Sequence, residues 1–168
     1  MIDESMRSGK MWTSHMPLLI KLLLGTEGTV IEVGSGPFST PLLHWLCSYT
    51  GRKLITYENV KSYFKFAKQF QSKYHSIRFV ETWDDMPVQK CSVIMIDHEP
   101  SERRVVDIER FKDACDYMIV HDTEEKRNDL YHFDRISHFF KNRVDFTSGN
   151  RTTVFSNKDL SFLEKVPN

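Results

Sequence analysis

The residues best suited to chemistry lie in one short stretch, TVIEVGSGPFST, at positions 29–40. Its apolar run contains one acid, Glu32, and is followed by two glycines, Gly34 and Gly36. Glycines at the end of a strand let the main chain turn tightly and let a ligand come close to it. The free N–H groups at the start of the following helix attract a carboxylate or a phosphate. The pattern predicts a ligand-binding loop formed by Glu32, Gly34, Ser35, Gly36, Ser39 and Thr40.

A second acid stands about two dozen residues beyond the glycines, where the apolar run KLITYEN ends. Glu58 at this place can accept hydrogen bonds from both hydroxyls of a ribose. An isolated glutamate here would more simply be a solvated residue beside the following helix. Together with the glycine loop, Glu58 and its neighbour Asn59 predict a nucleoside site.

These residues must be positioned by the alternation of apolar runs and amphipathic segments along the chain. Parallel strands joined by helices bring their carboxyl ends to one edge of a sheet. We expect an α/β fold with a doubly wound, mostly parallel seven-stranded sheet, helices on both faces and a C-terminal antiparallel hairpin, Rossmann-like in its core. The predicted helices are 17–24, 39–50, 59–73, 101–114 and 130–140; the predicted strands are 29–33, 53–58, 76–81, 91–97, 116–122, 143–147 and 152–156.

The glycine loop, the acid after the second strand and the final hairpin resemble the class I S-adenosylmethionine-dependent methyltransferases over about residues 29–156. In that family the ExGxG segment lies beneath the methionine part of the cofactor, and the acid binds the ribose. Glu32, Gly34, Gly36 and Glu58 match those positions. The resemblance implies S-adenosyl-L-methionine as cofactor and methyl transfer to an oxygen or nitrogen of an acceptor.

The same resemblance assigns adenine contacts to the loop after the third strand, ETWDD at 81–85. Thr82 and Trp83 are the nearest matches, and Asp84 or Asp85 is implied for the adenine amino group. The alternative for Trp83 is a lid over the edge of the core.

Two further segments, IDHEP at 96–100 and HDTE at 121–124, are similar to those of the catechol-type O-methyltransferases, which hold a magnesium ion. Asp97, His98 and Asp122 match, but Thr123 stands where that family has asparagine and Pro100 stands near its catalytic lysine. A divalent metal on Asp97 and Asp122 is therefore the less favoured interpretation. The favoured one is that Asp97 anchors a loop or the cofactor's amino group and that Asp122 caps a helix.

A hydroxyl acceptor benefits from a general base, and histidine has a suitable pKa range. His98 and His121, with Asp97, are the catalytic candidates, and Asp97 and His98 are also candidate cofactor contacts. No role is assigned to His44, His75, His132 and His138.

The family resemblance also suggests a division of the chain. Residues 1–28 are an N-terminal helical segment covering the cofactor and acceptor pocket, 29–160 the core, and 161–168 a tail. Trp12 and His15 would face the pocket, or Thr13 or Ser14 would cap the first helix. Ser39 or Thr40 is expected to cap the second helix.

The composition of the chain limits the classes of binding partner that we expect. Lys plus Arg and Asp plus Glu each number 23, so we expect no extended basic surface for nucleic acid or anionic membranes. The apolar run 16–25 is too short to span a bilayer, and three scattered cysteines favour a reducing compartment. We expect a cytoplasmic enzyme acting on a small-molecule acceptor, with no nucleic-acid or membrane partner and with homo-oligomerisation left open.

Other functions remain open. The same cofactor can undergo sulfonium cleavage, and the missing lysine and asparagine favour a non-catalytic cofactor-binding module. A nicotinamide-dependent oxidoreductase is disfavoured, because Ser39 stands where a third glycine is expected. A nucleic-acid methyltransferase is not expected, since neither an NPPY-like motif nor a dense basic stripe is visible.

Overall fold

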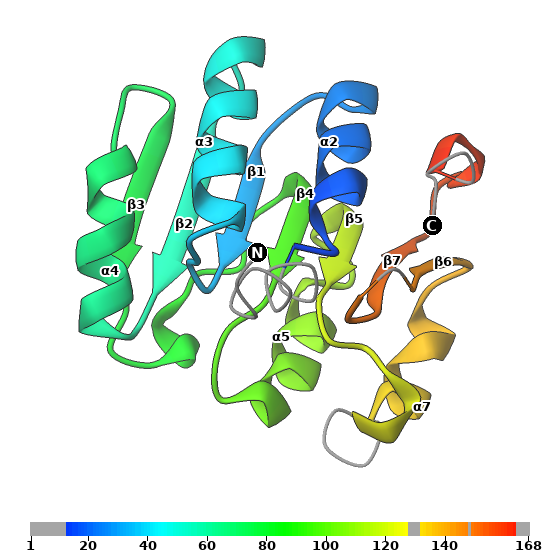
Figure 1. Ribbon diagram of the computed structural model, residues 1–168. Helices are drawn as coiled ribbons and strands as arrows, with labels where there is room; N and C mark the ends of the chain where they lie inside the picture. The colour runs from blue at the N-terminus through cyan, green and yellow to red at the C-terminus, as the bar shows by residue number, and fades with distance from the viewer. Residues whose placement is uncertain (1–12, 128–131, 148, 164–168) are drawn as a thin grey trace, which may run out of the picture.

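The structure, a computed structural model, describes residues 13–127, 132–147 and 149–163 (Figure 1). Its centre is a seven-stranded sheet with the order β3-β2-β1-β4-β5-β7-β6. The strands are β1 (Val30–Val33), β2 (Leu54–Glu58), β3 (His75–Phe79), β4 (Cys91–Ile96), β5 (Cys115–Val120), β6 (Asn142–Phe146) and β7 (Thr152–Ser156).

The first five strands are parallel, and β7 lies antiparallel between β5 and β6. The chain adds β2 and β3 on one side of β1 and then crosses to add β4 and β5 on the other. This reversal places a crevice outside the carboxyl ends of β1 and β4, where open α/β sheets bind ligands. The predicted fold class is confirmed in its strands, their direction and the final hairpin.

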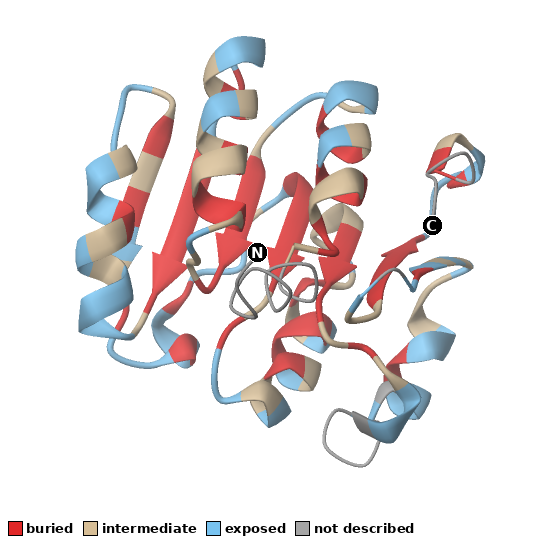
Figure 2. Cartoon of the chain, in the orientation of Figure 1, coloured by how far each residue is buried: buried red, intermediate tan, exposed pale blue. Residues whose placement is uncertain are grey.

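Helices cover both faces of the sheet because its central strands are mostly apolar on both sides, and β4 is buried at every position. Figure 2 shows the buried strands running beneath the helices. One apolar cluster packs α2 (Met16–Gly25) and α3 (Ser39–Thr50) on the sheet, and the other packs α5 (Arg104–Phe111) and α7 (Phe133–Ile136).

Two predicted helices are shorter than their apolar stripes suggested. The segment 59–73 forms α4 (Lys61–Ala67) and a 3₁₀ turn (Lys68–Phe70), after which Gln71 is extended. The described part of segment 130–140 forms α7 and a second 3₁₀ turn (Ser137–Phe139). A periodic stripe identifies the buried face, but it does not locate where hydrogen bonding changes from α to 3₁₀.

The predicted caps are wrong for both N-terminal helices. The N-cap of α3 is Phe38, which makes no side-chain cap, and the Thr40 hydroxyl donates to Glu32 instead. The N-cap of α2 is His15, also without a side-chain cap, and the Ser14 hydroxyl lies 3.1 Å from Nε2 of His121. In both cases the hydroxyl that we predicted to cap a helix contacts a buried polar side chain instead: Thr40 contacts Glu32, and Ser14 contacts His121.

Within the described residues, no helix has the length and apolar character needed to cross a membrane. Trp12, expected to face the pocket, lies outside these residues.

Candidate functional site

A cavity of about 370 Å³ opens at the carboxyl ends of β1, β2, β4 and β5. Its size is within the range of small-molecule sites, and it lies at the reversal of strand order. The lining residues are His15, 34–39, Glu58, Val60, Tyr63, 97–99, Arg104, His121, Asp122 and Asn150. The fold thus brings together the glycine loop, the acid of β2 and the two rim segments after β4 and β5.

Glu58 joins the second strand to the glycine loop. Ser35 donates to Oε2 through its main-chain N–H and its hydroxyl, each at 2.8 Å. The N–H groups of Asn59 and Val60 donate to Oε1, also at 2.8 Å. A carboxylate has about four acceptor positions, so a ribose hydroxyl must replace one of these donors. The Ser35 hydroxyl can rotate away, whereas the three main-chain donors are held by the fold.

Gly34 is required by its surroundings. Its φ of 88° lies in the left-handed region, and an added Cβ would come within 2.7 Å of the Cα of His98. The loop therefore turns directly against the end of β4, where a side chain has no room. Gly36 has no such constraint, because an added Cβ would meet only Ser39 Oγ at 3.5 Å.

Glu32 is buried beneath the loop and does not line the cavity. Its carboxyl accepts from Thr40 Oγ1 at 3.0 and 3.1 Å and from Thr56 Oγ1 at 2.6 Å. Burial raises the pKa of Glu32 to about 7, against the lowering effect of these hydroxyls. Thr40 also accepts from the N–H of Gly36 at 3.0 Å, so Glu32 positions the loop through Thr40.

The opposite wall of the cavity is a charged cluster around Arg104, which sequence reasoning missed. This buried guanidinium lies 3.1 Å from Asp97 Oδ1 and 3.5 Å from Asp122 Oδ2. It also donates to the main-chain oxygens of His98 at 2.8 Å and His121 at 3.1 Å. Arg104 therefore ties the ends of β4 and β5 to α5. The run SERR directly after the acidic rim segment was the available signal.

His121 lies between two carboxylates. Its Nδ1 is 3.4 Å from Asp97 Oδ1 and 3.4 Å from Asp122 Oδ1. Burial opposes protonation of the ring, but Asp122 and Asp97 outweigh it and raise the pKa of His121 to about 9. At neutral pH the ring is therefore charged and poorly suited to accept a proton.

His98, the other predicted base, is fully buried and faces away from an acceptor. Its Nε2 lies 3.0 Å from Oδ2 of buried Asp107, and its ring stacks at 4.4 Å beside that of Trp83. His98 is nonetheless among the residues that line the cavity. The arrangement fits a positioning role beneath Gly34 better than proton transfer.

The predicted adenine contacts are not brought to the cavity. Trp83 is buried and donates from Nε1 to the main-chain oxygen of Glu99 at 2.8 Å, so it is the lid over the core edge. Thr82 and Asp85 cap each other's main chain at the start of a 3₁₀ turn (Trp83–Asp85), and Asp84 pairs with Arg103 at 2.8 Å. The polar side chains that the resemblance assigned to adenine are therefore bonded to neighbouring protein groups: Thr82 and Asp85 to the 3₁₀ turn, and Asp84 to Arg103.

His15 is buried at the cavity wall, and neither ring nitrogen has a hydrogen-bond partner in the described part of the chain. Its ring meets that of His121 edge-on, with centroids 5.1 Å apart. Burial and the nearby charge of His121 lower the pKa of His15 to about 4, although Asp97 and Asp122 act in the opposite direction. His15 is therefore a neutral imidazole with free hydrogen-bonding capacity at the site.

One constellation at this wall can hold a metal ion. Ligand atoms of His15, Asp97 and His121 all lie within 4.8 Å of one another. The guanidinium of Arg104 already pairs with Asp97, however, and it neutralises the carboxylates as a cation would. Asp122 accepts from Asn150 Nδ2 at 2.5 Å, while Thr123 is buried against Thr153 and does not line the cavity.

Comparison with known proteins identifies the fold. No family model matches the chain, and no curated protein matches its sequence. Solved structures that match include a methyltransferase from Pyrococcus furiosus (14% identity, TM-score 0.59, 85% of this chain and 83% of that one). The S-adenosylhomocysteine-bound Podospora anserina methyltransferase PaMTH1 also matches (8%, TM-score 0.66, 87% and 78%). The catalytic domain of hMettl16 is a third (12%, TM-score 0.62, 87% and 70%). The chain therefore has the class I methyltransferase fold.

The last comparison corrects one expectation. The structure of the hMettl16 domain is a complex with MAT2A 3′UTR hairpin 1, so this fold accommodates a nucleic acid. The exclusion of nucleic-acid partners is therefore wrong. It rested on a net charge of zero and on the lack of an NPPY-like motif and of a dense basic stripe in the sequence. Net charge describes the whole chain and not the distribution of charge over its surface.

Proposed function

We propose that this protein is an S-adenosylmethionine-dependent methyltransferase that transfers a methyl group to an oxygen or nitrogen of an acceptor in the described cavity. The observation that carries the proposal is the direct bonding of Glu58 to Ser35 of the glycine loop. This contact presents an acid and bare main chain side by side at the strand ends, as a ribose and an amino-acid chain require.

Each part of the cavity has a task in this proposal. Glu58 binds the ribose hydroxyls in exchange for the Ser35 hydroxyl, and Gly34 lets the loop turn closely against the end of β4 so that its main chain lines the cavity. Ser39, at the start of α3 and on the cavity wall, offers its main-chain N–H to the cofactor carboxylate, since the N–H of Thr40 donates to Gly36 and Pro41 has none. The bound cofactor supplies an activated methyl group, so the protein has to align the acceptor and exclude water.

The acceptor is proposed to lie against the wall formed by His15, Asp97 and His121. His15 is the neutral group there, and its unbonded ring nitrogens can accept a hydrogen bond from the O–H or N–H of the acceptor. The carboxylate of Asp97, beside the charged ring of His121, orients the acceptor by a hydrogen bond.

The proposal predicts that Glu58→Ala weakens binding of both S-adenosylmethionine and S-adenosylhomocysteine by about 1–3 kcal/mol, because charged hydrogen bonds to the ribose are lost. Isothermal titration calorimetry measures this directly. The matched control is Glu81→Ala, an exposed acid just after β3. Equal affinities for wild type and Glu58→Ala, or tighter binding of NAD than of either nucleoside, would reject the site.

Two acceptor classes remain within this function. The cavity volume suits a small molecule. A nucleic-acid acceptor is favoured by a separate observation, the exposed lysines Lys61, Lys65 and Lys68 of α4 and its following turn. The start of this helix lines the cavity. Incubation with methyl-labelled cofactor separates these from the rival functions: label in an acceptor supports transfer, and free labelled fragments indicate sulfonium cleavage. Cofactor that binds and stays intact with every acceptor indicates a binding module.

A further inference from the structure

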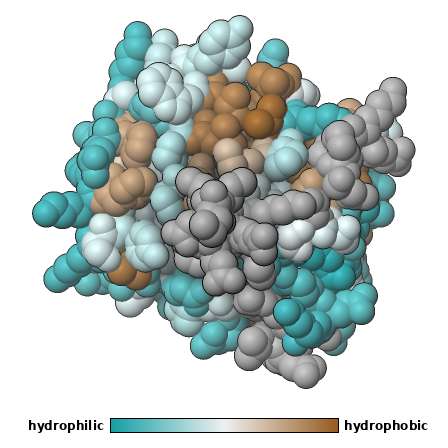
Figure 3. Space-filling model, viewed as in Figure 1, coloured by the Kyte–Doolittle hydropathy of each residue, from teal (hydrophilic) through white to brown (hydrophobic). Residues whose placement is uncertain are grey.

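The basic residues of this chain are unevenly distributed. From Asn59 to Val80 the sequence contains no aspartate or glutamate and five basic residues: Lys61, Lys65, Lys68, Lys73 and Arg78. All five are exposed. Because the chain as a whole is neutral, the remaining residues carry a matching negative excess. The edge of the molecule formed by α4 is therefore positive relative to the rest, and Figure 3 shows hydrophilic side chains along this outer edge.

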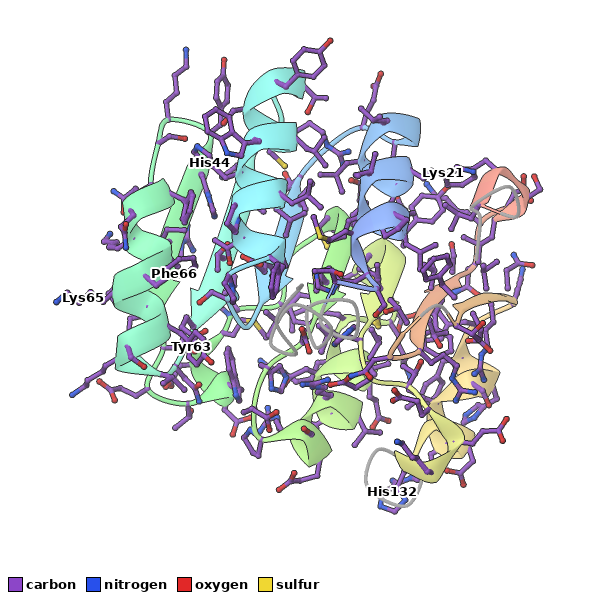
Figure 4. All side chains as sticks on the ribbon, viewed as in Figure 1. Lys21, His44, Tyr63, Lys65, Phe66 and His132 are labelled. Atoms are coloured by element: carbon purple, nitrogen blue, oxygen red, sulfur yellow. The ribbon has the colours of Figure 1, made fainter. Side chains whose placement is uncertain are left out.

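Three of these lysines form a row. Lys61, Lys65 and Lys68 follow one another at i, i+4 and i+7, so they share one face of α4 and its continuing turn. Along the helix axis Lys61 and Lys65 are about 6 Å apart and Lys65 and Lys68 about 4.5 Å, so the row spans about 10 Å. Figure 4 shows Lys65 pointing away from the sheet, whereas Phe66 of the same helix lies toward it.

The row is not neutralised by carboxylates. Among the described residues, none of the three lysines makes an ion pair, and Lys68 donates only to the side-chain oxygen of Gln71. Some other exposed cations are paired with acids, as in Arg143 with Asp145 at 3.0 Å and Lys158 with Asp116 at 2.9 Å. The free charges of the row are thus available to an anionic partner.

The row leads into the candidate active site. Val60 and Tyr63, at the start of the same helix, line the cavity. Tyr63 is 49% exposed, so its ring offers a face at the cavity rim on which a flat base can stack. One helix therefore supplies backbone-binding charge along its length and an aromatic platform at the entrance.

We propose that the Lys61–Lys65–Lys68 row binds the phosphate backbone of a single-stranded nucleic acid and that Tyr63 stacks on the base that reaches the cavity. Proteins that hold single strands without reading their sequence combine basic side chains for the backbone with aromatic side chains for the bases. Tyr63 is two residues from both Lys61 and Lys65, so it projects on the other side of α4, toward the cavity, and the strand has to pass over the start of the helix to reach it. Binding of the strand is independent of the proposed function. Only the further step, methylation of the base at the cavity, rests on it.

The test is fluorescence anisotropy with labelled single-stranded RNA and DNA of about ten nucleotides, titrated over a series of salt concentrations. Each phosphate neutralised on a single strand contributes about −0.7 to the slope of log affinity against log salt. The double variant Lys61→Gln/Lys65→Gln should therefore make the slope shallower by about 1.4. The matched control is Lys53→Gln/Lys90→Gln, which removes equal charge from exposed lysines at the amino ends of β2 and β4.

Tyr63→Ala provides a second measurement with a different signature. It should weaken binding about fivefold or more and leave the salt slope unchanged, because stacking is lost without loss of charge. Phenylalanine at this position should restore the affinity. Thermal melting by circular dichroism establishes that each variant is folded.

The proposal is overturned if both lysine pairs change the slope equally, or if polyglutamate displaces the oligonucleotide as well as unlabelled polyuridine does. Absence of oligonucleotide binding by wild type overturns it as well. Failure of cofactor binding is a separate result: lysine-dependent strand binding by a protein that does not bind S-adenosylmethionine would reject the proposed function and keep this surface.

Discussion

Individual residues of the glycine loop carry different constraints, although they look alike in sequence. Gly34 combines a left-handed φ with main-chain atoms of the next strand in the space where a Cβ would stand. Gly36 has neither. Steric contacts within the protein therefore require glycine at position 34. At position 36 they do not, so glycine is needed there only if a bound cofactor occupies the space.

We predict that Gly34→Ala lowers the free energy of unfolding by about 2–4 kcal/mol, because backbone strain and a clash with the main chain of His98 add. Gly36→Ala, the matched control, should change it by less than about 1 kcal/mol, since its nearest neighbour is a rotatable hydroxyl. Urea unfolding of the two variants measures the difference. Equal destabilisation would contradict the close approach of the loop to β4.

Glu32 predicts a pH dependence of stability. Its pKa is raised to about 7 in the folded protein, so the folded state holds a proton that the unfolded state releases above about pH 4.5. The contribution of protonated Glu32 to the free energy of unfolding is complete below about pH 4.5, and it is lost as the pH rises through about 7. Glu32→Gln keeps the shape of the neutral acid and should be more stable than wild type by about 2–3 kcal/mol at pH 8.

This advantage should disappear in acid. Urea midpoints measured from acidic to mildly alkaline pH give the comparison, with the exposed Glu109→Gln as control. If the difference between Glu32→Gln and wild type is the same at every pH, then Glu32 is not titrating in the folded state.

At the scale of elements, α5 is connected to the sheet edge through two buried polar side chains, Asp107, which contacts His98, and Arg104. Arg104 contacts main-chain oxygens after both β4 and β5 and pairs with the carboxylates of Asp97 and Asp122. A buried ion pair adds little net stability while intact, but removal of one partner leaves uncompensated charge.

Arg104→Met should therefore destabilise the protein by about 3–5 kcal/mol, since two carboxylates near the cavity lose their common partner. The control Arg78→Met removes an exposed guanidinium from β3 and should cost less than about 1 kcal/mol. Thermal or urea unfolding measures both. A small effect at Arg104 would mean that solvent or another cation compensates Asp97 and Asp122 in solution.

At the scale of the whole molecule, the order of strands determines which loops meet. The glycine loop, Glu58, Asp97 and Asp122 are separated in sequence and converge because β1, β2, β4 and β5 are adjacent and parallel. The loop after β3, with Thr82 and Trp83, does not join this group of loops at the cavity, although β3 is also parallel. There, capping and burial used the side chains locally.

The sequence by itself determined the fold class and half of the site, because apolar periodicity, turn residues and the spacing from glycines to acid are local properties of the chain. It did not determine which histidine is free. His98, His121 and His15 have the same side chain, and only the tertiary structure supplies the partners that bury the first, charge the second and leave the third unbonded. Arg104 and the lysine row of α4 were likewise decided by three-dimensional neighbours, since the effect of a charge depends on what lies within a few ångströms of it and not on its position along the chain.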